Sequence, residues 1–421
     1  MTVYPLKSVR TLALAAQGLA QKNGTEPPAS AAMIAELVRR LTCIQIDTLQ
    51  RVHRSQYLAV WSRLGCYPTG LLDALAYGGL DEDGQVLERQ LFEYWYHAAC
   101  LLPLDMYRFR LQRMRSAQAG RHETTREWLA QAETKRLLAA VLRRIEREGP
   151  LLARDFDDPR PERGVWWDWK PAKHALEHLY NCGALMIANR VRFQRVYDLK
   201  QRVLPPWVDR REPSEKAAAR YILERAALAL GICELRQVAD YSYDFSRPEA
   251  APHLEAMVRD GVLVPVKARL ANGEIHELVV HHENMESLQK AADGELKAER
   301  TTLLSPFDTL FYPKGRDQML WGFRQVLEAY KPAPQREWGY FCLPILDRDR
   351  LVGRLDPKLE RKAGRLRIEA LYLEPGVKQT RRLVRSVAKT LRDFMRFHNA
   401  HDLVIERSVP DGFGKVIMDE L

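Results

Sequence analysis

The tetrapeptide Ile44-Gln45-Ile46-Asp47 follows a segment from about Ser30 to Arg40 that is predicted to be helical. If the tetrapeptide is extended, its side chains alternate, so Ile44 and Ile46 point one way while Gln45 and Asp47 point the other. The amide can then hold a polar ligand, and the carboxylate can orient a water, take its proton or sit beneath a developing cation. An amide and a carboxylate on one face are a minimal pair for hydrolysis.

A purely structural role for Asp47 is the alternative. Asp47-Thr48-Leu49-Gln50 has the pattern of a helix N-cap followed three residues later by an amide. On this interpretation the next helix begins at Asp47. The residues alone leave both interpretations open.

Composition and charge set the broad class. The 421 residues are 46% hydrophobic, and 65 basic against 55 acidic residues give a net charge of +10. Such a chain can bury several cores, and its charge favours a polyanionic partner without excluding an ordinary basic enzyme. The six cysteines include no Cys-x-x-Cys pair, so we expect neither disulfides nor a cysteine zinc site, and a reducing cytoplasm fits. No run of eighteen apolar residues predicts a membrane span.

Several short motifs of the sequence occur in the same order and spacing in one known family. Through the motif Leu41-Thr42-Cys43-Ile44-Gln45-Ile46-Asp47, the chain resembles the YcaQ/AlkX-type winged-helix DNA glycosylases, bacterial enzymes that unhook interstrand crosslinks. The family signature of Gln, an apolar residue and Asp falls on Gln45, Ile46 and Asp47. A sister branch of the family has Gln in place of the Asp, and this chain has the Asp of the other branch. Similar words continue along nearly the whole chain, at residues 57–65, 93–97, 166–171, 193–199, 304–308 and 340–344.

Two positions depart from the family pattern. Glu93-Tyr94-Trp95-Tyr96-His97 is commonly followed by Glu, where this chain has Ala98. After Ser305-Pro306-Phe307-Asp308 the family commonly has Pro and then Trp, where this chain has Thr309 and Tyr312. The first departure puts a supporting role of that acidic side chain in doubt, whereas the Gln-x-Asp pair is untouched.

A repeat in the middle of the chain predicts the fold class. Leu176-Glu177 and Leu254-Glu255 are each followed after five residues by a glycine, Gly183 or Gly261, and then by a β-prone run. Hairpins are predicted at 184–189 with 191–199 and at 262–270 with 274–281. Because helices precede each hairpin, we predict an α+β fold of tandem winged-helix (helix-turn-helix) domains that form a DNA-binding groove. The zinc-peptidase-like spacing His174-x-x-Glu177-His178 lies inside this repeat, and we take it as coincidental.

Four domains are predicted from these patterns. Winged helices are expected at 1–125, which carries the Gln-x-Asp motif, at 126–208 and at 209–298. A small β-barrel-like domain at 299–421 would contain a basic hairpin, from residues 351 to 373, and a terminal helix at 379–398. Residues 345–398 contain fifteen basic and seven acidic residues, so 15 − 7 = +8 of the net charge lies there.

The candidate site residues fall into three groups. Gln45 and Asp47 are the candidate catalytic residues, and the resemblance implies that a hairpin probes DNA, although a merely solvated β-ribbon is the alternative. The candidate DNA contacts are Arg51, Arg54, Arg354, Lys358, Arg361, Lys362 and Arg365. Weaker candidates for lining the site are Tyr57, Trp61, Trp95 and His97.

The predicted function combines the residues with the resemblance. We expect a monofunctional DNA glycosylase that hydrolyses the bond between deoxyribose and N7-alkylguanine, including crosslinked guanine, with Asp47 activating water and Gln45 positioning it. No metal and no cofactor are predicted. The expected partner is double-stranded DNA with alkylated or crosslinked guanine, and the expected protein is a cytoplasmic, nucleoid-associated monomer. The competing function is a non-catalytic winged-helix DNA-binding protein such as a regulator.

Overall fold

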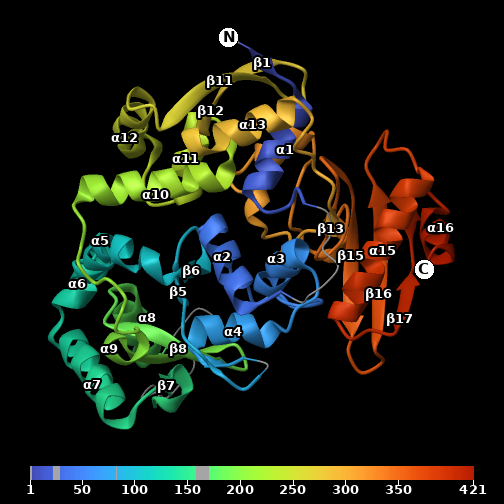
Figure 1. Cartoon of the computed structure of the whole chain (residues 1–421). Helices are drawn as coiled ribbons and strands as arrows, with labels where there is room; N and C mark the ends of the chain where they lie inside the picture. Colours follow the sequence, from blue (N-terminus) through green and yellow to red (C-terminus); the bar gives the residue numbers. More distant parts are fainter. Residues whose placement is uncertain (1, 22–28, 82, 158–169) are drawn as a thin grey trace. The chain divides into compact units, whose positions relative to one another are not determined.

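The computed structural model describes residues 2–21, 29–81, 83–157 and 170–421 (Figure 1). It divides into two compact units, of which unit 1 comprises Met1–Leu72, Tyr96–Cys100 and Ala219–Leu421, and unit 2 comprises Asp73–Trp95 and Leu101–Ala218. Both units mix helices and strands, as the α+β prediction requires. Trp166 to Trp169 of the family-like words lie outside the described residues. Within the described ranges, the helices all fall short of the length and apolar character that a membrane span needs.

The N-terminal part of unit 1 places the Gln-x-Asp motif between two helices. Helix α1 spans Leu6–Ala16, and α2 spans Ala31–Leu41 with the Ser30 hydroxyl accepting the Met33 N–H, as its sequence predicts. Thr42 has a left-handed backbone (φ 63°) and ends α2. The short strand β2, Ile44–Gln45, follows directly, and α3 begins only at Ser55 and ends at Leu64.

A four-stranded sheet in unit 1 has the order β1-β11-β12-β10. The predicted hairpin is confirmed as β11 (Leu263–Arg269) and β12 (Ile275–His281), turning at Gly273 with φ 88°. Strand β1 (Val3–Tyr4) runs parallel to β11, a pairing that crosses the predicted domain boundaries. The other elements of this region are β10 (Ile232–Cys233), α10 (Glu215–Leu230), α11 (Leu235–Ser242), α12 (Arg247–Arg259) and α13 (Met285–Ala292), which packs beside α1 in Figure 1.

This order of helices, short strand and hairpin is the one that the sequence predicted for the third winged helix. The hydrophobic core beneath the sheet combines Leu12 and Ala13 of α1 with Ile232, Val266 and Val280 from the strands. Residues near the start of the chain are therefore part of the same core as residues after 230. The identification of these elements as a DNA-binding winged helix stays a prediction.

The C-terminal part of unit 1 is built on an open six-stranded sheet, a strongly curled half-barrel rather than a closed barrel. The basic hairpin is confirmed as β15 (Arg350–Glu360) and β16 (Arg365–Leu373). Helix α15 (Arg381–Phe397) carries the chain back so that β17 (Asp402–Ile405) and β18 (Ser408–Val409) pair with β16 in parallel. The prediction of α15 as the terminal helix is wrong, because α16 (Phe413–Asp419) follows. The remaining elements are β13 (Thr301–Leu303), β14 (Leu343–Asp347) and α14 (Arg316–Trp321).

Unit 2 contains the other predicted hairpin, β8 (Leu185–Val191) with β9 (Gln194–Leu199), and β9 also pairs with β7 (Leu151–Leu152). Gly183 precedes it with φ 71°, a left-handed backbone that favours glycine, and a Cβ there would lie 2.5 Å from Met114 Sδ. The further elements are α4 (Thr69–Tyr77, shared with unit 1), β3 (Gly79–Leu80), β4 (Val86–Leu87), β5 (Leu91–Trp95), β6 (Ala99–Pro103, shared), α5 (Tyr107–Gln118), α6 (Glu123–Ala130), α7 (Ala132–Glu148), α8 (Pro171–Asn181) and α9 (Lys200–Val203).

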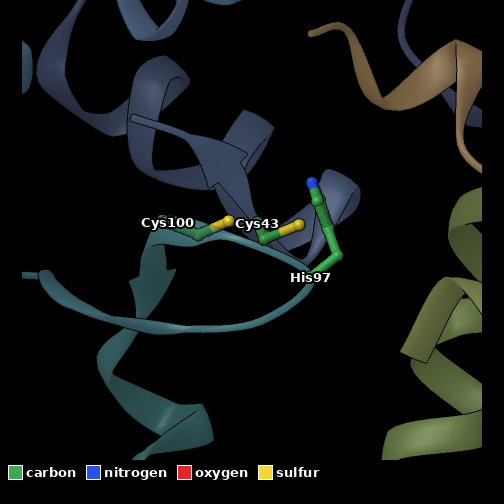
Figure 2. Close-up of side chains that lie close together, drawn as sticks. All are labelled: Cys43, His97 and Cys100. Atoms are coloured by element: carbon green, nitrogen blue, oxygen red, sulfur yellow. The ribbon is translucent and has the colours of Figure 1, made fainter. Parts of the chain in front are cut away.

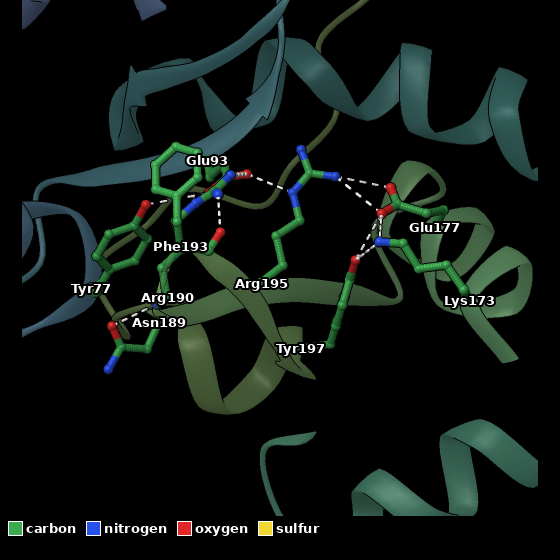
Figure 3. A network of polar contacts seen from close by, with 9 residues as sticks. All are labelled: Tyr77, Glu93, Lys173, Glu177, Asn189, Arg190, Phe193, Arg195 and Tyr197. Atoms are coloured by element: carbon green, nitrogen blue, oxygen red, sulfur yellow. Dashed lines mark hydrogen bonds and ion pairs between the residues drawn. The ribbon is translucent and has the colours of Figure 1, made fainter. Parts of the chain in front are cut away.

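A buried network of charges holds unit 2 together (Figure 3). The Glu93 carboxylate, fully buried on β5, accepts hydrogen bonds from Arg190 at 2.6 Å and from Arg195 at 2.7 Å. Arg195 also donates to Glu177 of α8, which accepts a further bond from the Tyr197 hydroxyl and pairs with Lys173. Burial by itself would raise the pKa of Glu93, but the two guanidinium groups hold it below its usual value. Because the Glu177 carboxylate is committed to this network, the His-x-x-Glu-His spacing has a structural explanation.

A second buried ion pair lies in unit 1. The guanidinium group of Arg63, on α3, donates to both carboxylate oxygens of Asp308, at 2.7 and 2.9 Å, and the two side chains are 1% and 0% exposed. Arg63 Nε also donates to the carbonyl of Gln17, just after α1. This bidentate pair connects three segments that are far apart in the sequence.

Substitution Asp308→Asn is expected to destabilise the protein by about 3–5 kcal/mol, since it leaves a buried guanidinium without its counter-charge. The exposed pair Arg365–Asp402, with side chains 41% and 40% exposed, is the matched control, and Asp402→Asn should cost less than about 1 kcal/mol. Urea unfolding of both variants provides the comparison. Equal losses would mean that the buried pair does not stabilise unit 1.

Candidate active site

The extended geometry predicted for the Gln-x-Asp motif is confirmed. Ile44 and Ile46 are buried, whereas Gln45 and Asp47 are half-buried on the opposite face. The N–H of Ile46 donates to the carbonyl of Ala99 at 2.8 Å, and the Ser55 hydroxyl donates to the carbonyl of Gln45 at 2.8 Å. These two bonds fix the backbone of the motif and direct both polar side chains away from the core.

The interpretation of Asp47 as a helix N-cap is wrong. Its Oδ1 accepts the N–H of Leu49 at 2.8 Å, but residues 46–54 contain no helix, and α3 begins at Ser55 with Arg54 at the N-cap position. The bond belongs to a local turn of the kind that Asp side chains commonly make. The carboxylate therefore stabilises a loop and leaves its second oxygen for other partners.

The Asp47 carboxylate is partly shielded from water, and its hydrogen-bond donors are neutral groups. Burial raises the pKa of Asp47, and the N–H groups of Leu49 and Thr48 and the side chain of Gln45 oppose that rise. An aspartate with a raised pKa and neutral partners accepts a proton more readily than a salt-bridged one. This is the behaviour required of a carboxylate that takes a proton from water.

Gln45 connects Asp47 to His97. Its Oε1 lies 3.1 Å from His97 Nε2, so the amide oxygen accepts the imidazole N–H while the amide nitrogen donates to Asp47. The His97 ring stacks on Tyr312 with centroids 4.2 Å apart and the planes at 22°. Asp47, Gln45, His97 and Tyr312 thus form one row, and all four belong to unit 1.

The other candidate lining residues lie elsewhere. Trp61 is 3% exposed and packs against Phe394 and Phe397, so its predicted place at the site is wrong because the ring belongs to the core. Tyr57 is half-buried on α3, with its ring edge against His53. Trp95 belongs to unit 2, where its Nε1 donates to Asn181 Oδ1 at 2.7 Å. Among these candidates in the described part of the chain, His97 makes an observed hydrogen-bond contact with the Gln-x-Asp pair.

One predicted DNA contact is contradicted by its burial. Arg354 is 1% exposed, and its guanidinium group donates to Glu374 and to the carbonyl of Arg324 while it lies over the rings of Phe323 and Trp338. Such a side chain is a core cation with its hydrogen bonds made inside the protein, so it is not available to phosphate.

The remaining basic candidates are closer to solvent. Arg361 and Lys362 are exposed at the turn of the hairpin, although Arg361 also donates to the carbonyl of Val52 at 2.6 Å. Lys358 and Arg54 are half-buried, and Arg51 and Arg365 form ion pairs at 2.6 Å with Glu369 and Asp402. The turn is thus the part of the hairpin that is best placed to reach a phosphate.

Four neighbours of the motif were not among the candidates. Tyr312 appeared in the sequence only as a departure from the family's Trp, and that aromatic position was the signal that could have identified it. Tyr330 is 76% exposed, and its pKa is raised first by burial and then by the carboxylate of Asp47. Cys43 directly precedes the motif in the sequence, and Figure 2 shows its side chain close to that of Cys100, which no spacing along the chain predicts.

Comparison with known proteins identifies the family and the fold of the chain. The sequence model of a family described as DNA glycosylase AlkZ-like matches residues 38–397. The solved structure of Streptomyces sahachiroi DNA glycosylase AlkZ has a TM-score of 0.62 to this chain, covering 96% of this chain and 100% of that one, at 16% sequence identity. At that identity the structural likeness shows a shared fold.

Substitution Asp47→Asn should leave the protein at least as stable as the wild type near neutral pH. Because the pKa of Asp47 is raised in the folded protein, the stability that its protonated form provides is present below the unfolded-state pKa and is lost as pH rises through the folded value. Asparagine stays neutral, so it avoids that loss and can still accept the Leu49 N–H. Urea unfolding at about pH 7 and about pH 4 tests the sign. A variant less stable than wild type by more than about 1 kcal/mol at pH 7 would indicate a mainly structural role.

Proposed function

The chain belongs to the AlkZ-like DNA glycosylase family, and from this membership we propose that it is a monofunctional glycosylase that releases N7-alkylguanine and unhooks crosslinks containing such a base. The observation that carries the site assignment is the row from Asp47 through Gln45 to His97, because all three residues lie within the segment that the family matches. The substrate is double-stranded DNA with an alkylated or crosslinked guanine.

The proposed reaction requires few catalytic groups from the protein. Alkylation at N7 makes guanine a cationic leaving group, so the base departs without being protonated. Water attacks the C1′ carbon, the bond from C1′ to the base breaks with its electrons passing to the base, and the water's proton goes to Asp47. The same carboxylate stabilises the positive charge that develops on the sugar. One half-buried Asp with neutral partners is therefore sufficient.

Gln45 and His97 act as positioning residues in this mechanism. The Gln45 amide is polarised from both ends, donating to Asp47 and accepting from His97, so the orientation of the carboxylate is fixed before substrate binds. Tyr312 in turn limits rotation of the His97 ring by stacking on it. The lone pairs of the Asp47 carboxylate that its hydrogen-bond donors do not use would orient the water.

Water is the nucleophile we assign, rather than a side-chain amine. The flanking cations along the chain are Arg39, Arg40, Arg51 and Arg54. Guanidinium groups are too basic to form a Schiff base with the sugar, whereas lysine amines can. No step of this mechanism is assigned to a metal.

DNA binding is assigned to the predicted winged helices and to the basic turn. A crosslinked base is tied to the opposite strand, so the site must be open enough to act without full extrusion of the base. The turn at Arg361 and Lys362 supplies charge that holds the backbone independently of sequence. A monomer suffices for this arrangement, and its DNA substrate would place the protein at the nucleoid in the cytoplasm.

Given a duplex containing N7-methylguanine or a nitrogen-mustard crosslink, the purified protein should release the base, leave a strand that breaks only after alkali, and give no borohydride-trapped adduct. Asp47→Asn should lower the excision rate by at least about a hundredfold while changing DNA affinity little. Asp293→Asn removes the same charge from an exposed position of unit 1 and is the matched control. Excision at the wild-type rate by Asp47→Asn would disprove the role of Asp47, and absence of base release by the wild type would favour a non-catalytic regulator.

Neutralising the basic turn with Arg361→Gln and Lys362→Gln should weaken binding to any duplex and reduce the slope of log affinity against log salt by about one to two. Lys378→Gln with Lys415→Gln removes two exposed charges from the same C-terminal region and should change the slope less. Equal slopes for the turn variant and the wild type would show that the turn does not contact phosphate.

A further inference from the structure

We propose that Cys43, His97 and Cys100 form a binding site for a thiophilic divalent cation of the Zn²⁺ class. One potential ligand atom from each residue lies within 4.8 Å of the other two, and Figure 2 shows the three side chains gathered next to β2. Cys43 and Cys100 are buried and His97 is half-buried. Two sulfurs and one imidazole are the ligand set that zinc and similar soft cations prefer.

The hydrogen bond to Gln45 leaves one ring nitrogen of His97 with an unused lone pair. Gln45 Oε1 can only accept, so Nε2, 3.1 Å away, carries the hydrogen. Nδ1 then has the lone pair, and it is buried with no hydrogen-bond partner among the residues that the structure describes. Metal-bound histidines characteristically donate their second ring N–H to an oxygen acceptor, which is the bond that His97 makes to Gln45.

The backbone holds these ligands in place before any cation binds. Cys43 lies between α2 and β2, and the hydrogen bond from the Ile46 N–H to the Ala99 carbonyl fixes that segment beside the one that contains His97 and Cys100. A tetrahedral zinc with bonds of about 2.3 Å to sulfur and about 2.0 Å to nitrogen needs ligand atoms roughly 3.5–3.8 Å apart. The ligand atoms, all within 4.8 Å of one another, would have to approach to that spacing when a cation binds, with water as the fourth ligand.

Charge supports the same assignment. Two thiolates neutralise a divalent cation, which lowers the cost of burying it. The cation would hold His97, and through Nε2 it would fix the amide of Gln45. The site depends on these three side chains and not on glycosylase activity, and it assigns the cation no place at the bond that is cleaved.

The direct test is a titration of the metal-free, full-length protein with Zn²⁺ under reducing conditions, in competition with a chromophoric chelator. One equivalent should bind, and Co²⁺ in its place should give thiolate-to-metal charge-transfer absorption. Cys43→Ser and Cys100→Ser should each weaken binding by about a hundredfold or more, because a hydroxyl is a poor ligand for a thiophilic cation. Cys66→Ser, at a partly exposed thiol elsewhere in unit 1, should bind like the wild type.

A second measurement needs no variant. In moderate urea, where local opening exposes the buried thiols, Zn²⁺ should slow the alkylation of Cys43 and Cys100 of the wild type by iodoacetamide, as mapped by mass spectrometry, while leaving the labelling of Cys66 unchanged. Failure of the wild type to bind one equivalent, retained binding in both cysteine variants, or protection of other cysteines instead would each overturn the proposal. Base release is not measured, so the site and the glycosylase mechanism succeed or fail independently.

Discussion

The bidentate pair between Arg63 and Asp308 is the interaction on which the arrangement of the candidate site depends. Neither side chain has access to water, so each requires the other, and the segments that carry them must meet. Thr309, the next residue, donates its hydroxyl to Gln17 Oε1 at 2.7 Å and strengthens the same junction. Three residues further on, the ring of Tyr312 reaches His97. The charge pair therefore fixes the segment whose Tyr312 packs against His97 of the candidate site.

The elements that the sequence predicted well are those in which local preference and tertiary packing agree. Both repeat hairpins follow a left-handed glycine, and at Gly183 the close approach of Met114 favours the same residue that the turn prefers. The predicted alternation of buried and partly exposed side chains in Ile44-Gln45-Ile46-Asp47 is also present in the fold, because burial of both isoleucines reinforces the extended backbone. Prediction succeeded there because no distant contact opposed the local signal.

The errors arise where several structures share one local pattern. An Asp that accepts an N–H two or three residues ahead is common to helix caps and to turns, and only the later start of α3 distinguishes the two. Arg354 looks like the other cations of its hairpin, yet its strand faces the core, where aromatic rings cover its guanidinium group. Trp61 likewise lies near the motif in the sequence but faces the phenylalanines of α15. In both cases the burial depends on partners that lie outside the local sequence pattern.

The five residues Tyr96–Cys100 belong to one unit but lie, along the chain, between two segments of the other. This pentapeptide belongs to unit 1, but it is joined by peptide bonds at both ends to unit 2, and it carries His97. On the ribosome, unit 2 can be completed while the later segments of unit 1, beginning at Ala219, are still being synthesised. In the finished protein, a local opening of unit 2 near residues 95 or 101 would be transmitted through covalent bonds to the imidazole that holds Gln45. The candidate site is thereby joined by peptide bonds to a unit that supplies neither Gln45 nor Asp47.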